Sequence, residues 1–107
     1  MYWPVKDPAD VLDYSIVFED INPEVENLAF ATFTIALQGA AGTTGTALIS
    51  AVALGPGYAS SFNIRTATIW LANGRAGESY LVSCLAGGDV APGRIYERSV
   101  SITIANR

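Results

Sequence analysis

The fold is decided by the stretch Ser99-Val100-Ser101-Ile102-Thr103-Ile104, close to the C-terminal end of the chain. Branched apolar residues occupy its even positions, and hydroxyl residues occupy its odd positions. Successive side chains of a strand point to opposite faces, whereas a helix would need apolar residues three or four positions apart. The stretch therefore predicts a β-strand with one face in a core and the other in water.

The same alternation recurs along the chain from Val11 onward. It is clear over residues 32–37, 66–71 and 80–85, each of which is rich in β-branched or aromatic residues. Within each stretch the residues of one parity are apolar, and we expect them to share a core. The predicted core residues are Phe33, Ile35, Leu37, Ala67, Ile69, Leu71, Tyr80, Val82, Val100, Ile102 and Ile104.

Glycine- and proline-rich segments separate these strands, at residues 39–45, 55–57, 73–77 and 87–93. Strands with turn signals about every 10 to 15 residues, and a further short strand expected at 61–65, are typical of a sandwich. We therefore predict an all-β chain: a single immunoglobulin-like antiparallel β-sandwich over residues 14–107, preceded by an extended N-terminal arm over residues 1–13.

Tyr80 is expected to stabilise a corner of this sandwich. It follows a glycine turn at the start of the penultimate predicted strand, where sandwiches often place a tyrosine whose hydroxyl bonds to the backbone. The alternative is an ordinary core aromatic.

The arm has the composition of a binding segment. Pro4 and Pro8 favour extended backbone, and the apolar residues around them show no periodicity. Trp3 has no sheet of its own in this segment, and tryptophan is enriched where interfaces are tightest. We expect the arm to reach a neighbouring subunit, although Trp3 folded back on its own domain is the alternative. The predicted partner-binding residues are Trp3, Pro4, Val5, Lys6, Asp7, Pro8 and Asp10.

Charge is divided unevenly along the chain. Residues 1–26 carry seven acidic residues and one basic residue, a sum of −6, and the remainder carries three acidic and five basic residues, a sum of +2. The acidic end of one copy would attract the basic part of another, and such head-to-tail contacts form rings when the rotation closes. The alternative is that the acidic segment only keeps one end soluble.

Composition argues against several classes of function. The chain has no histidine and one cysteine, Cys84, so the usual general base and the commonest metal ligands are missing. We therefore expect no catalytic residues, no metal and no cofactor, and we expect Cys84 to be a small buried apolar residue. A net charge of −4 disfavours binding to nucleic acid or an anionic membrane. The residues also lack an apolar span or a signal peptide, so we expect synthesis in the cytoplasm without export.

Three segments resemble one family of bacteriophage proteins. Residues 5–14, V-K-D-P-A-D-V-L-D-Y, resemble the K-D-P-x-x-x-L-D-Y opening of small virion proteins known as fibre-to-tail adaptors. Residues 67–80 resemble the strand, G-x-A-G turn and tyrosine of that family, and residues 93–99 resemble its G-R and E-R-S ending. Phe33 stands where the family tends to carry a tryptophan.

The resemblance implies a non-enzymatic structural virion protein, an adaptor that links the tail body to fibres or spikes in several copies. The implied partners are other tail proteins: tail tube, adaptor or nozzle subunits, and tail fibres. An alternative is a capsid decoration or carbohydrate-binding adhesive domain that would use the flat rings of Tyr58 and Trp70.

Overall fold

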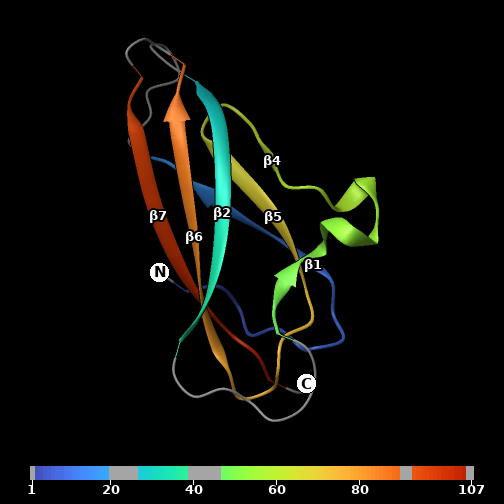
Figure 1. Ribbon diagram of the computed structural model, residues 1–107. Helices are drawn as coiled ribbons and strands as arrows, with labels where there is room; N and C mark the ends of the chain where they lie inside the picture. The colour runs from blue at the N-terminus through green and yellow to red at the C-terminus, as the bar shows by residue number, and fades with distance from the viewer. Residues whose placement is uncertain (1, 20–26, 39–46, 90–92, 106–107) are drawn as a thin grey trace.

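The computed structural model describes residues 2–19, 27–38, 47–89 and 93–105. Within them the chain forms strands and two short 3₁₀ helices (Figure 1). The elements are β1 (Leu12–Val17), β2 (Leu28–Gln38), β3 (Ile49–Ser50), η1 (Ala51–Leu54), η2 (Pro56–Tyr58), β4 (Ser61–Phe62), β5 (Thr66–Ala72), β6 (Ser79–Gly88) and β7 (Ile95–Thr103). The turn predicted at residues 39–45 and the acidic residues Asp20, Glu24 and Glu26 lie outside the described ranges.

The strands form two antiparallel sheets. In the first sheet, β5 pairs with β1 on one edge and with the two-residue strands β3 and β4 on the other. In the second sheet, β6 pairs with both β2 and β7. The prediction of an all-β chain with antiparallel sheets is therefore confirmed, and of the short strand expected at 61–65 only Ser61–Phe62 is formed, as β4.

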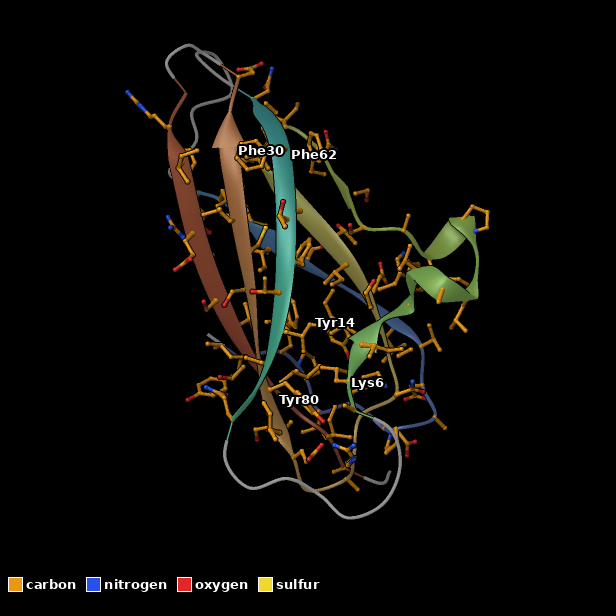
Figure 2. The ribbon with its side chains drawn as sticks, in the orientation of Figure 1. Lys6, Tyr14, Phe30, Phe62 and Tyr80 are labelled. Carbon is orange, nitrogen blue, oxygen red and sulfur yellow. The ribbon has the colours of Figure 1, made fainter. Side chains whose placement is uncertain are left out.

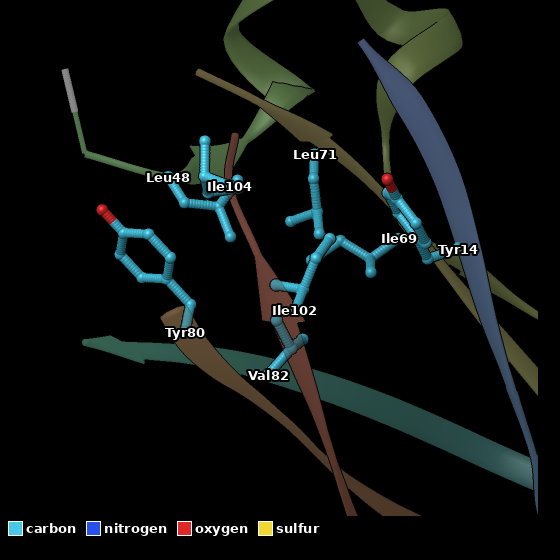
Figure 3. Close-up of a cluster of buried hydrophobic side chains, with 8 residues drawn as sticks. All are labelled: Tyr14, Leu48, Ile69, Leu71, Tyr80, Val82, Ile102 and Ile104. Carbon is cyan, nitrogen blue, oxygen red and sulfur yellow. The ribbon is translucent and has the colours of Figure 1, made fainter. Parts of the chain in front are cut away.

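The core lies between the two sheets and follows the predicted parity. In the first sheet Ile69 and Leu71 are buried, and in the second sheet Tyr80, Val82 and Ile102 face them. Figure 3 shows these side chains converging, with Tyr14, Leu48 and Ile104 completing the cluster. A second cluster contains Phe18, Val100 and Cys84. Cys84 is fully buried, as predicted, and this burial raises the pKa of its thiol to about 11.

The prediction for β2 was only partly right. Leu37 was expected in the core but its side chain is 42% exposed, and Phe33 and Ile35 are only half-buried. All three have the inward parity, because they pair with the buried residues Tyr80, Cys84 and Val82 of β6. The reason is the short opposing layer. β3 and β4 have two residues each, so the described strands of the first sheet leave part of the inner face of β2 uncovered.

The Tyr80 hydroxyl bonds to a buried carboxylate and also to backbone at Leu48 and Arg75, which is the kind of backbone contact that the sequence predicted. It donates to Oε1 of Glu78, whose side chain is buried and whose other oxygen lies 3.6 Å from Arg75. Burial raises the pKa of Tyr80, and the bond to Glu78 raises it further. Tyr80 therefore supplies a hydrogen-bond donor to an acid that is cut off from water.

Tyr80→Phe should lower the free energy of unfolding by about 1 to 3 kcal/mol, because the buried Glu78 carboxylate loses that donor. Urea unfolding of the variant and the wild type measures the difference. Glu78→Gln in the Tyr80→Phe background should recover part of the loss, since a neutral amide is cheaper to bury than a carboxylate. Equal stability of Tyr80→Phe and the wild type would show that Tyr80 contributes through packing alone.

Candidate partner-binding site

The N-terminal arm lies on its own domain, along β7. The Trp3 amide donates to Ser101 O and the Lys6 amide to Thr103 O, each at 3.0 Å. The Ala105 amide returns a bond of 3.0 Å to Lys6 O, and parallel bridges join Tyr2 to Ser101 and Lys6 to Ile104. The arm therefore extends the edge of the second sheet before the chain crosses to β1 in the first (Figure 1).

Trp3 is buried on one side by the core of its own chain. Its ring stacks on Tyr14 of β1, with 4.8 Å between ring centroids and 28° between the planes. It also packs against both buried clusters. The expectation that Trp3 lacks an intramolecular surface was wrong, because Tyr14 on β1 supplies an aromatic face. The prediction of partner binding by the arm now depends on its exposed residues.

Lys6 connects the arm to the turn between β5 and β6. Its side chain is buried, and its Nζ donates to Asn73 O at 2.7 Å and to Asp7 O at 2.9 Å (Figure 2). Desolvation lowers the pKa of Lys6, while the carboxylates of Asp10 and Asp7 act in the opposite direction. In this arrangement Lys6 attaches the arm to the domain.

A turn then redirects the chain into β1. The Asp7 carboxylate accepts from the Ala9 amide at 2.8 Å, and the Asp10 amide donates to Asp7 O at 3.1 Å. Asp and Pro at successive positions are typical of such turns. The turn places Asp10 between the arm and β1, with its side chain exposed.

The arm and β1 together enclose a groove, which we call the arm groove. It has a volume of about 510 Å³. Its residues come from both segments: Trp3, Pro4, Val5, Asp10, Leu12, Asp13, Tyr14 and Ser15. Val5 and Leu12 are each 40% exposed, and both aspartates are exposed. The groove thus combines apolar walls with two carboxylates.

Tyr14 gives the groove an unusual polar atom. Its hydroxyl is buried and makes no hydrogen bond with the described part of the chain. Burial raises the pKa of Tyr14, and the negative charges of Asp10 and Asp13 raise it further. The phenol therefore stays protonated at neutral pH. Carboxylates beside an aromatic and aliphatic wall form a suitable environment for the cationic head and apolar stem of an arginine or lysine side chain.

The structure brings together four of the predicted partner-binding residues. Trp3, Pro4, Val5 and Asp10 line the arm groove, while Asp7 and Pro8 form the turn beside it and Lys6 is buried beneath. Sequence reasoning missed the β1 residues Leu12, Asp13 and Ser15. Asp13 and Ser15 have the outward parity of the strand, which marks them only as solvent-facing. Leu12 has the same parity as the buried residues Tyr14 and Ile16, yet it is 40% exposed at the start of β1, and local spacing does not show this.

Other candidate sites find less support. Tyr58 and Trp70 meet edge to face, with centroids 5.3 Å apart and planes at 86°, so they do not form one flat platform for a sugar. Across the described ranges, no group of three or more acidic or cysteine side chains is placed to hold a metal ion. None of the described helices is long and apolar enough to cross a membrane.

Comparison with known proteins identifies a family. The family model described as "Podophage GP4 fiber-tail adaptor protein gp77" matches residues 6–103, which include the seven strands of the described ranges. Neither the curated proteins nor the solved structures give a significant match. The matched range begins at Lys6, the residue that attaches the arm to the domain.

Proposed function

This chain belongs to the podophage fiber-tail adaptor family, and from that membership we propose that it links the tail body to fibres or spikes as a multi-copy structural component of the virion. The observation that carries the proposal is the extent of the family match, which covers both sheets and the turn into β1. Such a protein holds other tail proteins together. It needs a rigid body and contacts that survive infection, and it needs no catalytic group.

The arm groove is the contact surface that we assign to this role. An interface anchor is strongest where an apolar side chain and a desolvated charge pair are buried together. The groove provides half-exposed Val5 and Leu12 beside the carboxylates of Asp10 and Asp13. We therefore expect a tail protein to insert an arginine or lysine side chain here.

In the proposed assembly, several copies of this chain form a ring. The division of charge between residues 1–26 and the remainder, −6 against +2, supports head-to-tail contacts between copies. In this proposal the chain is made in the host cytoplasm and is then incorporated beside tail tube, nozzle or fibre subunits. The immunoglobulin-like character of the sandwich belongs to the same proposal, supported by Tyr80 near the start of the penultimate strand.

The double variant Asp10→Asn, Asp13→Asn should enter virions less efficiently than the wild type. Both substitutions keep the shape of the groove and remove its charge, so a cationic anchor would lose its partners. Variant and wild type are produced together in cells infected with phage that lacks the gene, and mass spectrometry gives their ratio in purified virions. We expect the variant to be depleted by roughly tenfold.

Glu97→Gln is the matched control. Glu97 is an exposed acid on β7, at the opposite end of that strand from the residues that the arm contacts. Glu97→Gln removes one negative charge, as Asp10→Asn and Asp13→Asn each do. Equal recovery of the double variant and the control would contradict the assignment of the arm groove, while leaving the family assignment intact.

A further inference from the structure

Among the described strands, none pairs with the outer edge of β2. β6 pairs with one side of β2, and no described strand pairs with the other side. In antiparallel sheets, residues bond alternately to the two sides, so about half of the N–H and C=O groups of β2 face this open edge. At the first residue of the strand, the Leu28 amide donates to Ile64 O at 2.9 Å. Ile64 lies between β4 and β5, so this bond connects that end of β2 to the first sheet.

The sequence of β2 does not protect this edge. Natural edge strands are usually short, charged, interrupted by proline or covered by another segment. β2 has 11 residues, L-A-F-A-T-F-T-I-A-L-Q, without a charge or a proline. The opposite edge of the same sheet is covered, because the arm forms bridges to Ser101 of β7 and to Ile104, which directly follows β7. The exposed edge of β2 is therefore a ready template for another strand.

A groove runs along the inner side of this edge, and we call it the β2 groove. It has a volume of about 510 Å³, and its lining residues are all uncharged: Ala31, Thr32, Phe33, Ile35, Leu48, Ile49, Ser50, Ser60 and Ile69. Phe33 and Ile35 are half-buried, whereas their partners on β6, Cys84 and Val82, are fully buried. The inner face of the second sheet is thus incomplete at β2.

The surroundings of the β2 groove limit what can occupy it. Residues 48–50 and Ser60 form its far wall, and η1 and η2 project from that wall on the same side as the free edge of β2 (Figure 1). A whole domain that approached β2 edge to edge would meet this projection. A single extended segment would instead lie between β2 and the wall, bonding to the backbone of β2 on one side.

We propose that β2 accepts an extended, uncharged segment of another tail protein as an additional strand, an inference that depends on the proposed adaptor function. The backbone of that segment would bond to the free edge. Every second side chain would enter the β2 groove beside Phe33 and Ile35, and these side chains would be apolar, because the lining offers no charge to pair with.

Hydrogen–deuterium exchange tests this directly on the wild-type chain. In the isolated protein, the amides at the open edge of β2 should exchange much faster than those of β6, which is paired on both sides. In purified tails, peptides from residues 29–38 should become protected. Incorporation of the chain into tails with no change in exchange over these residues would overturn the strand-addition proposal but leave the adaptor proposal standing.

Two lysine substitutions at neighbouring positions give a second test. Ile35→Lys places a charge in the β2 groove, where the half-buried position lets the long side chain reach water in the free protein. Thr34→Lys places the same charge on the exposed opposite face of the same strand. In competition with wild type for entry into virions, Ile35→Lys should be depleted by roughly tenfold and Thr34→Lys by no more than about twofold.

Thermal unfolding of both variants checks that they fold. Equal depletion of the two folded variants would contradict the proposal and assign the contact to the outer face of the sheet. If Ile35→Lys does not fold, the exchange measurement on the wild-type chain decides the question alone.

Discussion

Deletion of residues 1–6 is expected to lower the free energy of unfolding by about 3 to 5 kcal/mol, the range typical of removing a large aromatic side chain from a core. The arm is a packed part of the domain. Its loss uncovers Tyr14 and removes the Lys6 donor from Asn73 O, leaving a carbonyl without its bond. It also removes the backbone bonds to Ser101 and Thr103. Guanidinium unfolding of the truncated chain gives the measurement.

Two single substitutions separate this packing from a general effect of shortening the chain. Trp3→Ala removes the ring that stacks on Tyr14 and should account for a large part of the loss. Tyr2→Ala removes an aromatic residue that is 83% exposed in the same arm, and it should change stability by no more than about 0.5 kcal/mol. Unchanged stability of the truncated chain would mean that the arm docks only on a neighbour, as the sequence alone had suggested.

The sequence was sufficient for the parts of the fold that depend on local periodicity. The alternation of residues 99–104 identified Val100, Ile102 and Ile104 as core residues, and all three are buried. The same rule succeeded for β5 and β6, where both sheets supply opposing side chains. It failed at Leu37, because parity shows which way a side chain points but not whether another layer lies opposite it.

The arm shows a different limit of sequence reasoning. Trp3 and Lys6 have no periodic pattern, and each makes a hydrogen bond to a residue far away in the chain, Ser101 and Asn73 respectively. Pairing between segments so distant depends on how the sheets are arranged, which local spacing does not encode. For the same reason, Asp13 was recognised as part of an acidic segment but not as a wall of the arm groove.

The fibre content of virions assembled without this chain shows whether the chain links fibres to the tail. Phage that lacks the gene is grown with and without a plasmid copy, and quantitative mass spectrometry gives the ratio of fibre protein to major capsid protein in purified particles. We expect particles that retain the tail body but lose nearly all fibre protein, with recovery when the plasmid supplies the chain. A normal fibre-to-capsid ratio in particles that contain none of the chain would show that it is not the link between fibre and tail.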